Sequence, residues 1–357
     1  MVDSINVVIQ GIRFIDEEHL KQLGIKDFKI FGPRQYSFTY REVSFSYYND
    51  YRNLAIKTTT HKILNKKDIK LSDKAEFVKR LNSIVNQILN TKGIDYNMKL
   101  TEIDYCSDVN VGDDRKEEYI KLLNKHLRRF KQKEKKKIYE ESIQVTTKSG
   151  GIVKGYNKEA EIIYKYNEKR EDIYLHNNND EKIIKKKLDN LKKRTQAEIE
   201  KYKGVIRLEI AMRKSNLKYY LKASSKKHSK DKNVPIEHRT IDNYWNKEKM
   251  EKHFFKEFKL YLYEGDYYKL DLAVNKIKES DISNSWKNKL TKFLQDISKS
   301  SIQNVKDNMT NGTFRNYIKQ LNMLKINPVT IDENSKYDCL KSLYSLAVEQ
   351  AENVYFD

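Results

Sequence analysis

Residues 205–210, VIRLEI, alternate apolar side chains with one arginine and one glutamate, which is the two-residue period of a β-strand. Ile206, Leu208 and Ile210 share one face of this strand, so Arg207 and Glu209 share the other. Charged groups flanked by such apolar residues are costly to bury unless they are paired or bind a metal ion. The stretch therefore predicts an interior strand that carries a polar site on one face of a sheet.

A second predicted strand, residues 100–109, carries carboxylates at a matching spacing. Asp104 and Asp108 are four residues apart and so lie on one face of it. Carboxylates clustered on a sheet supply the hard oxygen ligands that Mg²⁺ or Mn²⁺ prefers. We therefore predict Asp104, Glu209 and Asp108 as metal ligands, although a carboxylate at a strand end is often a turn residue. Two other interpretations stay open: Asp104 pairs with a nearby Lys or Arg, or Glu209 forms a cross-strand pair with Arg207.

Further strands and helices surround these two. Alternating or β-branched runs predict strands at residues 4–10, 43–47 and 54–58, and two more within 142–156. Apolar residues at helical spacing predict helices near residues 16–23, 77–88, 119–130 and 158–202. This order predicts an α+β fold in which helices flank a central, largely antiparallel sheet. We place that domain at residues 1–221, a basic linker at 222–235, and an all-helical domain for DNA or partner binding at 236–357.

The charge balance of the chain bears on its partners. Lys and Arg outnumber Asp and Glu by 71 to 51, which favours nucleic acid as a partner, although AT-rich codon use explains part of the lysine excess. The basic runs 131–137 and 222–232 suit phosphate contact. Near the C-terminus, a turn at Asn311-Gly312 followed by Arg315, Lys319 and Lys325 suits a helix-turn-helix DNA reader, or else a bundle that docks a partner.

Several function classes have no support in the sequence. There is neither an apolar run of about 18 residues nor a signal peptide, so we expect a soluble, cytoplasmic protein without a membrane partner. The two cysteines, Cys106 and Cys339, are far apart and encode neither a disulfide framework nor a thiolate zinc site. No glycine-rich phosphate loop is present, which argues against an ATP-driven motor. His61 and His126 are given no role.

Residues 155–161, GYNKEAE, place Tyr156 at the end of a predicted strand, and Lys158 and Glu161 open the following helix. A tyrosine hydroxyl, with a pKa of about 10, attacks phosphorus when a metal ion and a lysine offset that pKa and the phosphate charge. A phosphotyrosine ester keeps the energy of the DNA backbone bond, so a later hydroxyl can rejoin the strand. Tyr164 and Tyr166 follow in a similar context and stay open as alternative nucleophiles.

The order of these motifs resembles the gene II/X-type replication initiation proteins of filamentous phages. It is similar, more weakly, to the trans-acting rolling-circle Rep proteins of Gram-positive plasmids. The resemblance runs in order across residues 1–220. It rests on the opening MVD, on AIKT at 55–58, on Ile103-Asp104, on the Tyr-x-Lys-x-x-Glu block at 156–161 and on Arg-Leu-Glu at 207–209.

By this resemblance, Tyr156 is the nucleophile of a nicking and joining reaction that starts rolling-circle replication at a single-stranded DNA origin. Lys158 and Glu161 complete the catalytic block, and the carboxylates matching Asp104 and Glu209 hold Mg²⁺ or Mn²⁺, since the chain lacks a His-x-His pair. A host helicase and a host polymerase are the expected partners in a bacterial cell, and a homodimer stays open. The basic residues assigned to DNA contact are Lys57, Arg207 and Arg213.

Three alternatives to this function remain. A relaxase for plasmid mobilisation or conjugation uses the same chemistry. A non-catalytic protein that binds and marks an origin needs only the basic surface and predicts binding without cleavage. An RNA-binding protein or ribonuclease has only the charge in its favour. The enzyme alone requires Tyr156, Asp104 and Glu209 to lie within reach of one phosphate.

Overall fold

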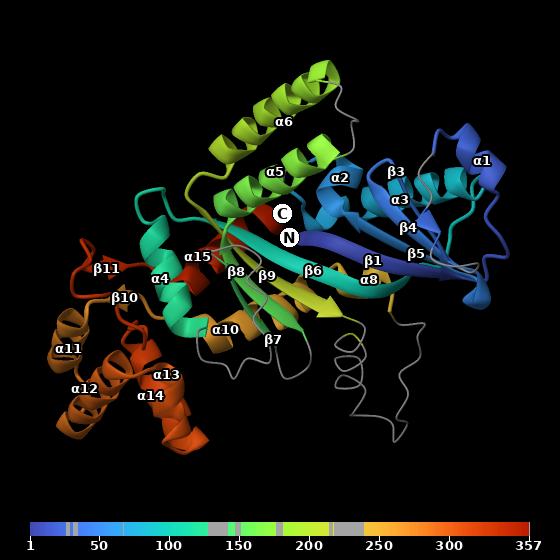
Figure 1. Cartoon of the computed structure of the whole chain (residues 1–357). Helices are drawn as coiled ribbons and strands as arrows, with labels where there is room; N and C mark the ends of the chain where they lie inside the picture. The colour runs from blue at the N-terminus through green and yellow to red at the C-terminus, as the bar shows by residue number, and fades with distance from the viewer. Residues whose placement is uncertain are drawn as a thin grey trace, which may run out of the picture.

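The computed structural model describes residues 1–25, 29–30, 35–66, 68–127, 142–146, 151–175, 181–213, 217 and 239–356. The described residues form a nine-stranded sheet in the order β2-β3-β4-β5-β1-β6-β9-β8-β7, and every neighbouring pair is antiparallel (Figure 1). The prediction of a central antiparallel sheet is confirmed. The strands are β1 Val2–Gln10, β2 Lys29–Ile30, β3 Gln35–Tyr40, β4 Val43–Tyr48, β5 Asn53–Thr59, β6 Lys99–Asn110, β7 Ser142–Thr146, β8 Ile152–Asn157 and β9 Val205–Arg213.

The two faces of the sheet differ because the strands alternate in polarity. On β9, Ile206, Leu208 and Ile210 belong to the apolar core, and Arg207 and Glu209 point to the opposite face. Directly opposed residues on neighbouring strands share a face, so the register carries this division across the sheet. We call the side that bears Arg207 and Glu209 the polar face.

Helices in the first two thirds of the chain lie where apolar residues recur at helical spacing. Phe77, Leu81 and Val85 of α3 are fully buried, as the spacing predicts. The two long helices α5 and α6 lie beside one another (Figure 1). The helices of this part are α1 Glu17–Gln22, α2 Thr60–Leu64, α3 Lys74–Ile88, α4 Lys116–Leu127, α5 Lys158–Leu175 and α6 Glu181–Lys201.

The C-terminal region is helical, as expected, with one correction. Tyr267 and Tyr268 of β10 pair with Cys339 and Leu340 of β11, so the region also holds a small two-stranded sheet (Figure 1). Strands of two residues are too short to show any period in the sequence. The helices are α8 Ile241–Tyr244, α9 Lys247–Met250, η4 Glu251–Phe255, α10 Lys256–Leu262, α11 Leu270–Glu279, α12 Asn284–Lys299, α13 Ile302–Asp307, α14 Asn311–Met323, α15 Leu343–Gln350 and η5 Ala351–Tyr355.

The expected turn at Asn311-Gly312 is wrong, because these two residues form the first turn of α14. Thr310 caps that helix, and its side chain accepts a hydrogen bond from the backbone N–H of Thr313. The basic runs 131–137 and 222–232 and the linker 222–235 lie outside the described residues. Along the described part of the chain, no helix combines the length and the apolar character needed to cross a membrane.

The C-terminal region packs against the sheet through buried contacts. The Tyr105 hydroxyl of β6 donates to the backbone oxygen of Tyr244 at 2.6 Å, and the Tyr119 hydroxyl of α4 donates to that of Lys341 at 2.8 Å. The rings of Phe77 on α3 and Trp245 lie 5.2 Å apart, centre to centre. One continuous apolar cluster therefore runs from the sheet into residues of the C-terminal helices.

Candidate functional site

Strands β6, β9 and β8 are neighbours, and their register brings the predicted site residues to one place on the polar face. Glu209 stands opposite Cys106 on one side and Lys154 on the other. The Tyr156 hydroxyl donates to Glu209 Oε2 at 3.0 Å, and Lys154 Nζ donates to Glu209 Oε1. The structure thus joins Tyr156 to Glu209, two residues that are 53 positions apart in the sequence.

Asp104 lies one pleat away from this group, on β6. Its Oδ2 accepts a hydrogen bond from the Ser4 hydroxyl at 2.5 Å, and among the described residues its buried Oδ1 has no hydrogen-bond partner. Burial, followed by the negative charge of Glu209, raises the pKa of Asp104 to about 7. Lys154 opposes that rise in pKa. An acid with an unpaired oxygen next to a second carboxylate is a site where a cation would be stabilised.

The Asp104–Glu209 pair fits a hard divalent cation. Mg²⁺ is commonly held by one or two carboxylates and completes its shell with water and phosphate oxygens. The unpaired Oδ1 of Asp104 and its repulsion by Glu209 are the features that favour such an ion. Within the ranges that the structure describes, no group of three His, Cys, Asp or Glu side chains gathers to hold a metal. The pair would therefore rely on substrate and water for its remaining ligands.

Asp108, the third predicted metal ligand, belongs to a different group. Arg207 donates from Nε to Asp108 Oδ1 at 2.5 Å, from Nη2 to Oδ2 at 2.6 Å, and from Nη1 to Asp3 Oδ1 at 3.1 Å. Burial acts to raise the pKa of Asp108, but Arg207 outweighs it and the pKa is lowered. Both oxygens of Asp108 are engaged by a guanidinium, so Asp108 is the counter-ion of Arg207.

Arg207 itself, predicted to contact DNA, is only 4% exposed. Its side chain lies beneath the surface, and Asp108 and Asp3 neutralise its charge there. The alternative of an Arg207–Glu209 pair is not what the structure contains, because Glu209 is bound by Lys154 and Tyr156 instead. Side chains two residues apart on one strand share a face but reach different neighbours, since each is opposed by a different residue.

The other two predicted DNA contacts lie in one row across four strands. Lys57 on β5 stands opposite Asn6, Asn6 opposite Glu102, and Glu102 opposite Arg213 on β9. Lys57 and Arg213 are both exposed. At about 4.8 Å between strands, the ends of this row are roughly 14 Å apart. The row adjoins the one that contains Asp104, so the two cations lie on one side of Asp104 on the polar face.

The helix that follows Tyr156 brings further charges. Glu161 accepts from Lys158 and, at 2.6 Å, from Lys165. Burial acts to raise the pKa of Glu161, but these two lysines lower it to about 2. Lys158 Nζ also lies 5.9 Å from the centre of the Tyr156 ring and 5.6 Å from that of Tyr202. Lys158 therefore contacts the face of the Tyr156 ring while it pairs with Glu161.

A pocket of about 300 Å³ opens between the polar face and α5. The alternative nucleophiles differ in their relation to it: Tyr164 contributes to its wall and is 39% exposed, whereas Tyr166 is half-buried and is not among its lining residues. A hydrogen bond with Glu168 raises the pKa of Tyr164. The lining residues are Lys154, Tyr156, Glu161, Tyr164, Lys165, Glu168 and Glu209.

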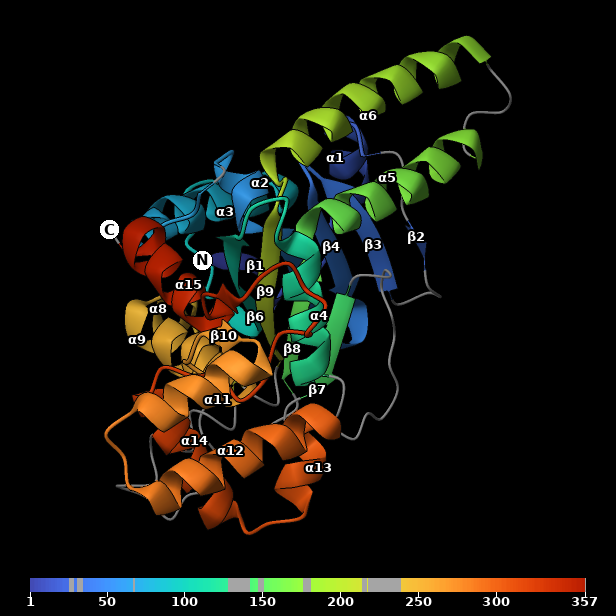
Figure 2. The same cartoon turned by 90° about the vertical axis from the view of Figure 1, so that its left-hand side faces the viewer.

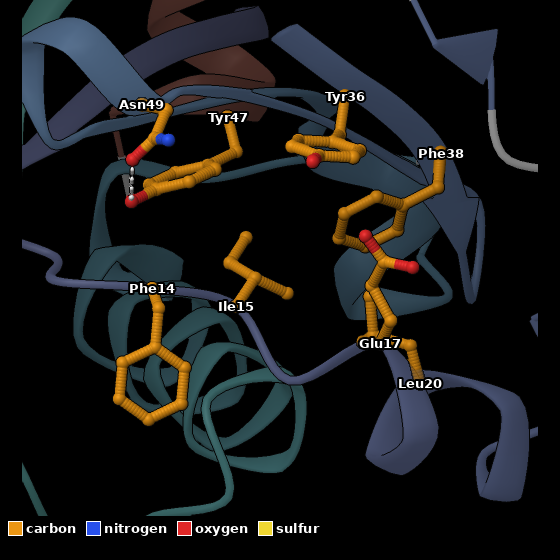
Figure 3. A pocket seen from close by; sticks show the side chains of 8 residues that line it. All are labelled: Phe14, Ile15, Glu17, Leu20, Tyr36, Phe38, Tyr47 and Asn49. Atoms are coloured by element: carbon orange, nitrogen blue, oxygen red, sulfur yellow. Dashed lines mark hydrogen bonds between the residues drawn. The ribbon is translucent and has the colours of Figure 1, made fainter. Parts of the chain in front are cut away.

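A second, smaller pocket of about 110 Å³ lies near the other end of the sheet, on its apolar face (Figure 3). Figure 3 shows Tyr36, Phe38 and Tyr47 of β3 and β4 above Ile15, with Glu17 as the acidic residue of the lining. The residues that line this pocket do not bring an acid together with a base or a nucleophile. Of these two pockets, the one at Tyr156 combines a nucleophile, carboxylates and lysines.

Sequence reasoning missed Lys154, Ser4 and Asp3. Lys154 had a usable signal, because it lies two residues before Tyr156 on the same strand and so shares its face. Ser4 and Asp3 had none, since their partners Asp104 and Arg207 lie 100 and 204 positions away. His61 was given no role. Burial lowers its pKa, and the positive charges of Arg207 and Lys158 lower it further, while Asp3 opposes them.

Comparisons with protein-family models, with curated proteins and with solved structures found no match for this chain. Its function is therefore inferred from the chemistry of the pocket at Tyr156.

Proposed function

We propose that this protein nicks and rejoins single-stranded DNA through Tyr156, in the manner of a rolling-circle replication initiator. The observation that carries this proposal is the hydrogen bond of 3.0 Å from the Tyr156 hydroxyl to Glu209 Oε2, at a pocket that also contains Lys154 and Lys165. A nucleophile that already donates to a carboxylate has a base in place for its proton.

The proposed step is an exchange of phosphodiester bonds. Tyr156 Oη attacks the scissile phosphorus and gives its proton to Glu209, the bond from phosphorus to the 3′ oxygen breaks, and that oxygen takes a proton from water. The 5′ end stays on Tyr156, and attack by a 3′ hydroxyl reverses the step. Lys154 and Lys165 supply positive charge beside the phosphate. A divalent cation held by Asp104 and Glu209 would add charge neutralisation at the phosphate oxygens.

The basic surface supports the DNA part of the proposal. The chain carries a formal net charge of +20, and the exposed Lys57 and Arg213 lie in the row next to Asp104. A strand that crosses this row would reach the pocket with its phosphates near both cations. In this function the protein works in the bacterial cytoplasm, where a host helicase opens the duplex and a host polymerase extends the 3′ hydroxyl.

The test is covalent adduct formation. The native protein and a Tyr156→Phe variant are incubated with Mn²⁺ and circular single-stranded DNA of the cognate replicon, or a random single-stranded pool, and resolved on a denaturing gel. Tyr164→Phe and Tyr166→Phe are the matched controls. We expect adducts with the native protein and both controls, and none with Tyr156→Phe. Adducts that persist in Tyr156→Phe would move the nucleophile elsewhere.

A second candidate is an origin-binding protein without nicking activity. It is favoured by the low exposure of Tyr156, which is 3%, and by the ion pair that already occupies Glu209. This candidate predicts tight binding of cognate DNA with no adduct at any divalent cation concentration. A relaxase would give the same adducts as the first proposal, and the DNA that is cleaved would distinguish the two.

A further inference from the structure

Helices α5 and α6 form a hairpin in which α6 is the outer member (Figure 2). Half-buried residues on α6 recur at helical spacing and face α5, namely Ile184, Leu188, Leu191, Thr195 and Ile199. No residue of α6 is fully buried. At 1.5 Å per residue, its 21 residues make a rod of about 31 Å. Most of its circumference is open to solvent.

The two helices of the hairpin differ in charge. The outer helix α6 has eight basic and four acidic residues, whereas α5 has four basic and five acidic ones. The excess of positive charge on α6 is four in 21 residues, compared with twenty in 357 for the whole chain. The positive charge of the hairpin is therefore concentrated on the side that faces away from the sheet.

The basic residues of α6 are also regularly placed. Two triplets, Lys185-Lys186-Lys187 and Lys192-Lys193-Arg194, are seven residues apart, and all six residues are exposed. Seven residues are nearly two helical turns, so each member of the first triplet points in nearly the same direction as its counterpart in the second. The triplets are about 10.5 Å apart along the axis, so the two groups of cations can contact different phosphates.

We infer that the outer face of α6 binds the phosphate backbone of duplex DNA beside the pocket. The inference rests on the proposed function, because α5 forms one wall of the pocket and carries α6 on its outer side (Figure 1). Proteins that hold single strands stack bases on aromatic side chains, and α6 contains no aromatic residue. A straight row of cations without a stacking surface fits a duplex backbone, contacted without regard to base sequence.

The test uses the full chain and a labelled duplex of random sequence. The variant Lys186→Gln/Lys193→Gln removes one cation from each triplet, and Lys292→Gln/Lys299→Gln on α12 removes two exposed lysines with the same spacing of seven. Fluorescence anisotropy gives the dissociation constant from 50 to 300 mM salt. Each lost phosphate contact lowers the slope of log affinity against log salt by about 0.9.

We expect the α6 variant to lower that slope by about 1.8 and the α12 variant to leave it unchanged. Equal slopes for the two variants would overturn the inference. A change of sedimentation in the α6 variant without DNA, at an unchanged slope, would assign the helix to contact with a second copy and would also overturn it.

The same variants separate this inference from the proposed function. A short single-stranded substrate does not extend to α6, so adduct formation on it should be unaffected by Lys186→Gln/Lys193→Gln. Native adducts with an unchanged duplex slope reject only the role of α6. A changed duplex slope without any native adduct rejects only the nicking reaction.

Discussion

Replacing Arg207 by glutamine tests whether this residue is a buried counter-ion or a DNA contact. The change removes the cation that binds both oxygens of Asp108 and one oxygen of Asp3. Losing one partner of a buried ion pair costs roughly 3–5 kcal/mol, because the remaining charge is left uncompensated. The side chains of Asp108 and Asp3 retain 17% and 15% exposure, so we expect a loss at the lower end, about 3 kcal/mol.

The assay is urea unfolding, followed by circular dichroism, at several pH values. In the native protein the lowered pKa of Asp108 contributes stability above its unfolded pKa, and this stability is lost as pH falls through the folded value. Without Arg207, burial, the largest influence on the pKa of Asp108, is opposed only by Lys158 and the N-terminal amine, and we expect that pKa to rise. The stability difference between native protein and variant should therefore be largest near neutral pH and should shrink as pH falls below about 5.

Arg213→Gln is the matched control, since Arg213 is an exposed arginine on the same strand. It should change the free energy of unfolding by less than about 0.5 kcal/mol. The reasoning is refuted if Arg207→Gln unfolds at the same urea concentration as Arg213→Gln at neutral pH while it weakens DNA binding. That result would make Arg207 a surface contact.

Three more changes have defined outcomes. The native pKa of Asp104, about 7, lies above its ordinary value of 3.8, so the stability of the native protein should fall as pH rises between these values. Asp104→Asn removes this titration, so its melting temperature should depend less on pH between pH 5 and pH 8 than that of the native protein. Tyr105→Phe leaves the buried carbonyl of Tyr244 without its donor and should cost about 1–3 kcal/mol in urea unfolding. Gly204 and Gly11 both have positive φ, +70 and +83, but a Cβ added at Gly204 would lie 2.6 Å from a backbone nitrogen, whereas one added at Gly11 would meet nothing within 4 Å. Gly204→Ala should therefore lower the melting temperature more than Gly11→Ala, and thermal melts of both variants measure that difference.

The strands were largely predictable because their signal is local. The alternation in VIRLEI places Arg207 and Glu209 on one face whatever the rest of the chain does, and the structure confirms that face. The same holds for the hairpin of β4 and β5. By contrast, the two residues of β10 carry no period, and only their pairing with β11, across 70 intervening residues, makes them a strand.

The partners of the site residues were not predictable in the same way. A strand pattern fixes which way a side chain points, but its partner depends on the register with the neighbouring strand. Arg207 meets Asp108 because these two residues are directly opposed, and Lys154 meets Glu209 for the same reason. Both registers join segments about 50 to 100 residues apart, and no local pattern encodes them. For this reason Arg207 was wrongly predicted to contact DNA.

The charges themselves favour the observed register of β6 and β9. A slip by two residues in one direction would place Asp108 opposite Glu209, and a slip in the other direction would place Asp104 opposite Glu209. Either slip keeps the apolar residues on the core face, so burial alone would not prevent it. Both slips, however, oppose two carboxylates and separate Arg207 from Asp108, which costs energy on a buried face. The ion pair between Arg207 and Asp108 therefore helps to keep Glu209 opposite Cys106, one pleat away from Asp104.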